Sequence, residues 1–271
     1  MRWWRSRAAA WLAPLALTAA AAGAVMAAGG VARAAELSAQ EILDRMSGTG
    51  ILHGSGQARL ELVTENRQGQ RRTYRLQFLR SEGQGGATRQ FLEYLEPADV
   101  RGTRFLSLEE PGQPSQMWLY LPALGRERRI AGSAAQDSFM GTDFSYQEIG
   151  GGRTYRTDYA AERQADATLD GRAAYVLRLT PRNPDSRYGY VQLWVWKETF
   201  LPLRIDFFDR RGQLDKQLTT GDFRQDERGT WFAYLITMAS VKAQTRTIIR
   251  VLEHQSKPVP DEVFTVRYLR R

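Results

Sequence analysis

The residue types that most often carry catalysis or bind metals are scarce in this sequence. It contains no cysteine, which excludes disulfides, thiolate nucleophiles and cysteine metal ligands together. The two histidines, His53 and His254, stand apart in strand-like surroundings and complete no HExxH or HxH pattern, so we expect no metal site. No serine lies in a GxSxG motif, and the glycine runs at 83–86 and 150–152 complete no phosphate-binding motif.

Carboxylates are the remaining candidates for acid–base chemistry. Asp206, Asp209, Asp222 and Asp226 are dispersed near the ends of predicted strands and form no motif. A glycosidase pair is an open alternative, because two carboxylates that are distant in sequence can meet in the fold. The sequence therefore assigns no catalytic residue, no metal ligand and no cofactor, and we predict that the protein is not an enzyme.

The charge of the chain argues against a nucleic acid partner. Arg2, Arg5, Arg7 and Arg33 precede residue 35, so 34 of the 38 basic residues remain beyond it, against 30 acidic ones. The excess is only +4 (34 − 30), and the signs alternate instead of forming a basic stripe. Most of these bases are arginines, which bind phosphate with two hydrogen bonds, so anionic head groups would suit them. A compositional bias of the genome explains the same preference for arginine.

The first 34 residues have the layout of a cleavable signal peptide. Arginines at positions 2, 5 and 7 precede an apolar run from about residue 8 to residue 28, and Ala32-Arg33-Ala34 supplies a small-x-small cleavage pattern. A membrane anchor is the alternative, since the run is nearly long enough to span a bilayer. We expect cleavage between Ala34 and Ala35, export to the periplasm, and a single domain over residues 35–271.

Short strands separated by turn residues fill most of that domain. Ser38 and Glu41 form a capping box that predicts one short helix, with Ile42, Leu43 and Met46 on its apolar side. The predicted strands are 58–63, 74–79, 90–95, 105–108, 117–121, one at Tyr155, 175–180, 188–196, 203–208, 216–223, 231–239, 246–252 and 264–269. Their spacing predicts a mainly β fold, with an antiparallel sheet curled into a barrel or half-barrel.

Several predicted strands are apolar on both faces, as where Val191, Leu193 and Val195 interleave with Trp194 and Trp196. An antiparallel strand with one face in water should alternate instead. One face should therefore meet the barrel interior, which is either an ordinary packed core or a ligand cavity under a helical lid. The candidate lipid-binding residues of such a cavity are Trp118, Tyr120, Trp194, Trp196, Phe207, Phe232 and Tyr234.

Residues 133–152 lack the period of a strand and predict a short helix and a loop. Within them the candidate lid or rim residues are Phe139, Met140, Gly141, Asp143, Phe144 and Tyr146. Gly141 permits a sharp turn, and we expect the apolar side chains to be exposed on a segment that opens readily. The alternative is a loop that plugs one end of the barrel for stability.

Three stretches carry a resemblance to a known family. They are 97–103 (PADVRGT), 117–130 (MWLYLPALGRERRI) and 137–146 (DSFMGTDFSY). Together they resemble the outer membrane lipoprotein-sorting proteins, LolA-like periplasmic carriers, across essentially the whole chain beyond residue 34. The resemblance implies an unclosed antiparallel β-barrel (half-barrel) of about 11–12 strands, with a few short helices covering the concave face and an apolar concavity for acyl chains.

The same resemblance implies a function. It predicts a monomeric chaperone that binds the acyl chains of a lipid or an acylated protein and transports them to the outer membrane, with an inner-membrane RND-type transporter as a partner. The alternative is an interaction or sensor module of the same fold that docks on such an exporter without carrying cargo. Lipid that co-purifies with the protein would separate the two hypotheses.

Overall fold

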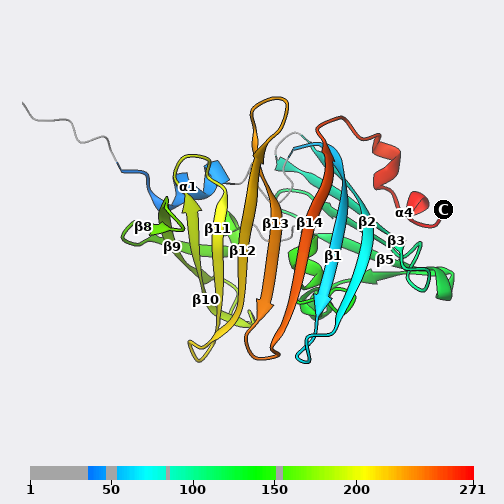
Figure 1. Ribbon diagram of the computed structural model, residues 1–271, viewed down its shortest axis with the longest axis horizontal. Helices are drawn as coiled ribbons and strands as arrows, with labels where there is room; N and C mark the ends of the chain where they lie inside the picture. The colour runs from blue at the N-terminus through cyan, green and yellow to red at the C-terminus, as the bar shows by residue number, and fades with distance from the viewer. Residues whose placement is uncertain (1–35, 47–53, 84–85, 151–154) are drawn as a thin grey trace, which may run out of the picture. The chain divides into compact units, whose positions relative to one another are not determined.

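The computed structural model describes residues 36–46, 54–83, 86–150 and 155–271 (Figure 1). The predicted signal peptide, its cleavage site and His53 lie outside these residues. Residues Leu37–Arg271 form one unit built around a single sheet of fourteen strands. Among the described residues, no helix is long and apolar enough to cross a membrane.

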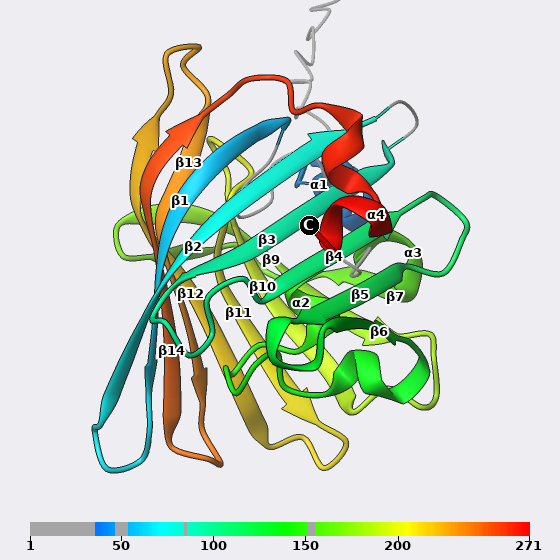
Figure 2. The same ribbon diagram turned by 90° about the vertical axis from the view of Figure 1, so that its right-hand side faces the viewer.

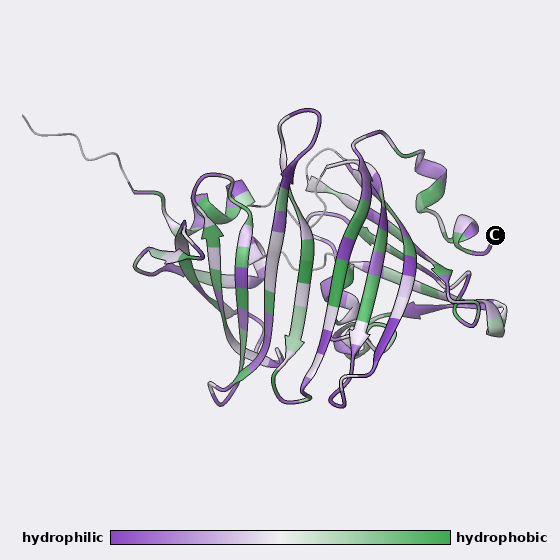
Figure 3. Ribbon diagram, in the orientation of Figure 1, coloured by the Kyte–Doolittle hydropathy of each residue, from purple (hydrophilic) through white to green (hydrophobic). Residues whose placement is uncertain are grey.

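The strands cover most of that unit. They are β1 (Gly56–Glu65), β2 (Arg71–Glu82), β3 (Thr88–Glu96), β4 (Arg104–Glu109), β5 (Gln116–Leu121), β6 (Arg126–Ile130), β7 (Tyr159–Arg163), β8 (Ala167–Leu169), β9 (Arg172–Pro181), β10 (Tyr188–Trp196), β11 (Pro202–Asp209), β12 (Leu214–Gln225), β13 (Trp231–Ser240) and β14 (Thr245–Gln255). Figure 3 shows apolar and polar residues interleaved along many of them, as expected for strands with two different faces.

The sheet is antiparallel and open. Its order is β6-β5-β4-β3-β2-β1-β14-β13-β12-β11-β10-β9-β7, with β8 paired to β9. Most pairs join consecutive strands, and the long-range pair β1–β14 aligns Leu60 with Val251 and Leu62 with Ile249. Because β6 and β7 occupy the two ends of this order and do not pair with each other, the barrel stays unclosed. This confirms the fold class expected from the resemblance.

Short helices complete the unit. They are α1 (Ala39–Met46), α2 (Tyr146–Ile149), α3 (Tyr155–Asp158) and α4 (Val266–Leu269), with 3₁₀ turns η2 (Pro122–Leu124), η3 (Gly132–Gln136) and η4 (Asp261–Phe264). The predicted capping box of α1 is confirmed: the Ser38 N–H donates to Glu41 Oε2 (2.8 Å), and the Glu41 N–H donates to Ser38 Oγ (3.2 Å). Ile42 and Leu43 of this helix are fully buried.

Five elements differ from the sequence prediction. The strand predicted at Tyr155 is the helical turn α3, and the predicted strand 264–269 is helical, with Thr265 capping α4 through the Tyr268 N–H. Strands β6, β7 and β8 were not predicted. Four of the five residues of β6 are charged, and β8 has only three residues. The sheet therefore has fourteen strands instead of about 11–12.

The inner face of the sheet, defined here as the face that carries the main core cluster, holds the aliphatic residues of the central strands. Leu62, Leu76, Ile236, Met238 and Ile249 are buried there together with α1. The turn at 138–146 and α2 pack against the same face, so the inner side of the sheet is where a ligand could be enclosed (Figure 2).

The outer face of β3 and β4 is covered by the C-terminal segment. Phe91 and Leu106 form a second cluster there with Val263, Phe264 and Leu269 of η4 and α4. Figure 2 shows this segment crossing β3 and β4 on the side away from the main core. These strands are apolar on both faces because each face has its own cover.

The outer face of β9–β13 is covered differently. Trp196 packs against Phe223 and Trp231, and the guanidinium of Arg172 lies 4.9 Å from the centres of both the Trp196 and Phe223 rings. Arg204 lies in the same way over Trp194. Arginine side chains stacked on rings shield apolar area from water while leaving the charge solvated, so this face is apolar without needing a helix over it.

Candidate functional site

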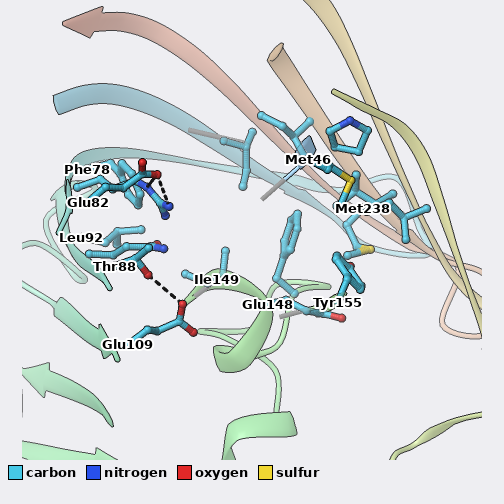
Figure 4. A pocket seen from close by; sticks show the side chains of 18 of the residues that line it. Met46, Phe78, Glu82, Thr88, Leu92, Glu109, Glu148, Ile149, Tyr155 and Met238 are labelled. Carbon is cyan, nitrogen blue, oxygen red and sulfur yellow. Dashed lines mark hydrogen bonds and ion pairs between the residues drawn. The ribbon is translucent and has the colours of Figure 1, made fainter. Parts of the chain in front are cut away.

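An apolar cavity of about 500 Å³ lies against the inner face of the sheet. Its walls come from α1, α2 and α3, from β1–β4 and from β11–β14. Its apolar lining residues are Leu43, Met46, Leu60, Leu62, Leu76, Phe78, Leu92, Phe144, Ile149, Tyr155, Pro202, Ile205, Phe207, Leu218, Ile236, Met238, Ile249 and Val251. Figure 4 shows Met46, Met238 and Tyr155 on one side and Phe78 and Leu92 on another. A cavity of this size and lining suits a small apolar ligand.

One end of the cavity is polar, and strand register explains why. On the inner face, Phe78, Leu92 and Phe105 lie level with one another on β2, β3 and β4. The next level is Arg80, Gln90 and Ser107, and the last is Glu82, Thr88 and Glu109. Because side chains on one face recur every second residue, all three strands change from apolar to polar at the same height.

The middle polar level is internally satisfied. Arg80 donates from Nε (3.2 Å) and Nη2 (2.8 Å) to Glu82 Oε1, and its side chain is only 13% exposed. The Gln90 amide, oriented so that both of its atoms are paired, accepts from Arg80 Nη1 (2.7 Å) and donates to the Ile149 carbonyl (3.0 Å). The Ser107 hydroxyl donates to the Gly150 carbonyl (2.9 Å). These bonds tie α2 to β3 and β4.

Glu109 stands apart in the outermost level. Its Oε2 accepts from the Thr88 hydroxyl (2.9 Å, drawn in Figure 4) and its Oε1 from the Ser115 hydroxyl (3.1 Å). In the described part of the chain, no lysine or arginine forms an ion pair with it. Burial raises the pKa of this carboxyl, and the bonds from Thr88 and Ser115 offset only part of that rise.

The other end of the cavity is closed by the turn at 138–146. Met140 (φ 48°) and Gly141 (φ 76°) form a tight left-handed bend. Across this bend, the Phe139 N–H donates to the Phe144 carbonyl (2.7 Å). The Asp143 N–H donates to Thr247 Oγ1 (2.9 Å), and the Asp143 carboxylate accepts from the Thr245 and Thr247 hydroxyls of β14. The turn is thus fastened to the middle of the sheet.

A buried charge pair supports this closed end. Lys216 Nζ donates to the Asp143 carbonyl (2.5 Å) and lies 3.7 Å from Glu148 Oε2, with both side chains at most 10% exposed. Glu148 also accepts from the Ser145 N–H (2.7 Å), which completes a capping box of α2, and from the Tyr188 hydroxyl (3.1 Å). Buried charges are tolerated only when they are paired and hydrogen-bonded in this way.

Of the seven cavity residues proposed from the sequence, Phe207 lines the cavity. Trp194 and Trp196 alternate with the buried Val191, Leu193 and Val195, so they lie on the outer face. Trp118 and Tyr120 also lie on the outer face, packed against the C-terminal cluster. Phe232 is buried beside His254, and Tyr234 packs at the margin of the core under Arg224. Aromatic density alone therefore pointed to the wrong side of β5 and β10.

The expectation that residues 139–146 expose apolar side chains is wrong. Phe139 is 0% exposed, Phe144 is 1% exposed and Tyr146 is buried. The Phe139 ring packs against Tyr94 and Phe105, the Tyr146 ring packs against Phe105, and Phe144 belongs to the main core cluster. Met140 is half-buried, Gly141 occupies the bend and Asp143 is hydrogen-bonded to β14. This arrangement favours the plug over the mobile lid, and whether the segment gates the cavity stays a prediction.

The polar end was not found from the sequence. Arg80 and Glu109 directly follow predicted strands, and Gln90 begins one. All three positions belong to the inner face by alternation, which is a usable signal once strand order is known. Without the register, nothing in the sequence brings residues 80, 90 and 109 to neighbouring places.

Comparison with known proteins agrees with this geometry. A family model with the description "Uncharacterized protein" matches residues 86–271, which is more than half of the chain. A domain described as an outer membrane lipoprotein-sorting protein from Vibrio parahaemolyticus is 26% identical, with a TM-score of 0.79 over 86% of this chain and 98% of that one. A DUF1329 family protein from Desulfovibrio piger is 26% identical, with a TM-score of 0.78 over 85% and 97%.

A LolA superfamily protein from Nitrosomonas europaea shares the fold at 22% identity, with a TM-score of 0.67 over 86% of this chain and 100% of that one. No curated protein matches the chain. An open antiparallel barrel around an apolar cavity defines the class of LolA-like proteins. The chain belongs to the matched family, and it is similar in sequence and fold to the lipoprotein-sorting domain from Vibrio parahaemolyticus.

Proposed function

We propose that the protein is a carrier that binds the acyl chains of a lipid or lipoprotein in the inner cavity and transports them through the periplasm to the outer membrane. The observation that carries this proposal is the cavity lining, which is mostly apolar from α1 across to β14. Its polar side chains are concentrated at the ends of β2, β3 and β4, with Glu148 and Arg156 as the other charged lining residues. The predicted signal peptide at 1–34 supports the periplasmic location.

Burial of acyl chains supplies enough free energy for such a role. Each buried CH₂ contributes about 0.8 kcal/mol, so a sixteen-carbon chain gains on the order of 12 kcal/mol before the cost of ordering it is subtracted. No covalent step is required, so a binding protein needs none of the catalytic residues that the sequence lacks. The similarity to a lipoprotein-sorting domain and this energetic argument together support a carrier over an enzyme.

A substitution on β13 tests the proposal with a control on the adjacent residue. Met238 points into the cavity (Figure 4). Thr237, the preceding residue, lies on the opposite face of the same strand. Met238→Trp should fill the cavity and weaken binding of a fluorescent fatty acid by at least about tenfold. Thr237→Trp should leave the affinity within about twofold. Denaturant midpoints of both variants show whether each remains folded.

The lipid content of the purified protein provides the second measurement. Mass spectrometry of extracts from the natively purified chain should find lipid in wild type and in Thr237→Trp, and little in Met238→Trp. If no lipid co-purifies and no fatty acid binds at micromolar concentration, the carrier proposal is wrong. The protein would then be an interaction module of the same fold, with an RND-type exporter as its proposed partner.

A further inference from the structure

We propose that the polar end of the cavity binds a positively charged amine in the head group of the lipid, with the Glu109 carboxylate as its counter-ion. This inference rests on the lipid-binding function proposed above and adds the chemical class of the ligand and its orientation.

The orientation follows from the two ends of the cavity. Phe144 and the turn fastened to Thr247 close one end, so an acyl chain that enters must point its methyl terminus toward them. The ligand's head group then lies at the level of Glu82, Thr88 and Glu109, where β2, β3 and β4 become polar together. An amphiphile matches this division, because its apolar and polar parts each meet their own kind of surface.

The charges at that end select the head group. Arg80 is neutralised by Glu82 at 2.8 Å, and the deeper carboxylate of Glu148 is held by Lys216 and by the Tyr188 hydroxyl. Glu109 also lies at the polar end. Among the described residues, no lysine or arginine forms a direct ion pair with its carboxylate. A half-buried carboxylate without a counter-ion is a costly feature that a bound cation would relieve.

The carboxylate is also held in place for such a ligand. Thr88 and Ser115 donate one hydrogen bond to each of its oxygens, which fixes its orientation. An ionised carboxylate has about four lone-pair sites, so each oxygen can still accept another bond. An ammonium group has three N–H donors and no acceptor, which complements two oxygens that are already oriented. A phosphate without an amine would instead be repelled at this position.

Matched lipids test the inference directly. Phosphatidylethanolamine and its N-acetylated form share acyl chains and phosphate and differ in the ammonium charge. We expect the delipidated protein to bind the first at least about tenfold more tightly. Hexadecylamine and hexadecanol form a second pair, which lacks the phosphate. Comparing their affinities shows whether an amine is preferred when no phosphate lies beside it. A preference in either pair supports the inference and identifies which source of the ammonium group is recognised.

Two variants connect the preference to this carboxylate. Glu109→Gln keeps the shape and removes the charge, and it should reduce the preference to less than about twofold. Thr88→Val, which removes one of the two hydroxyls that orient the carboxylate, should reduce it in part. Glu253→Gln on the exposed outer side of β14 is the control and should retain the full preference.

The outcomes separate this inference from the function on which it rests. If the amine and its uncharged counterpart bind wild type equally well, the head-group inference is wrong and the carrier function stands. If none of the four lipids binds, the carrier function fails as well. A preference that survives in Glu109→Gln would assign amine recognition to another group and would overturn the role of Glu109.

Discussion

Glu109 combines a charge with partial burial, and this conflict has a measurable consequence for stability. Its pKa is raised above the ordinary value of 4.5, chiefly by burial, with Asp158 also raising it and Arg80, Thr88 and Ser115 lowering it. The folded protein therefore holds this proton more tightly than the unfolded chain does. The stabilisation is present below pH 4.5 and is lost as the pH rises through the folded-state pKa.

Glu109→Gln should remove this dependence. Relative to wild type, the variant's free energy of unfolding should increase as the pH rises from 4.5 toward neutrality, and the two proteins should differ least near pH 4. Urea unfolding of the delipidated proteins across this range measures the difference. A constant difference at all pH values would mean that burial does not perturb Glu109, and Glu253→Gln serves as the exposed control.

The turn at 138–146 shows at the scale of an element how a segment without strand periodicity becomes part of the core. Its two phenylalanines are equally buried, yet Phe144 lines the cavity and Phe139 does not. Phe139 instead packs edge-on against Phe105 and Tyr146. The two side chains therefore share a stabilising role and differ in their access to a ligand.

Replacing each phenylalanine by alanine separates a structural plug from a gate. Both variants should lose about 3–5 kcal/mol of unfolding free energy, since each removes a fully buried ring. If the turn is a fixed floor, only Phe144→Ala should change the lipid off-rate, because only its ring lines the cavity. Stopped-flow release of a fluorescent fatty acid gives that rate. A faster release in Phe139→Ala, with little loss of stability, would support the mobile lid instead.

The open barrel as a whole couples ligand binding to folding. A ligand that binds the folded state alone stabilises it by RT ln(1 + [L]/Kd), which is about 2.7 kcal/mol at a hundredfold excess over Kd. The urea midpoint of the delipidated protein should therefore rise with fatty acid concentration. Met238→Trp should show a much smaller shift than Thr237→Trp. An equal shift in both variants would place the binding outside the cavity.

The sequence by itself determined the antiparallel β class, most strands and the α1 cap. These features depend on local signals, namely period-two alternation, turn residues and the Ser38–Glu41 box, which act between residues close in the chain. Helix α3 and the C-terminal helix were missed because short apolar segments such as 264–269 suit a strand or a helical turn equally well. The resemblance of 117–130 and 137–146 to lipoprotein-sorting proteins supplied the open barrel.

Only the tertiary structure decided which residues face the cavity. In β10 both faces are apolar, so alternation separates Val195 from Trp194 without saying which of them points inward. Likewise Arg80, Gln90 and Glu109 are ordinary polar residues until strand pairing brings their levels together at one end of the cavity. The register between strands depends on contacts across the whole sheet, and these contacts form only when the chain is folded.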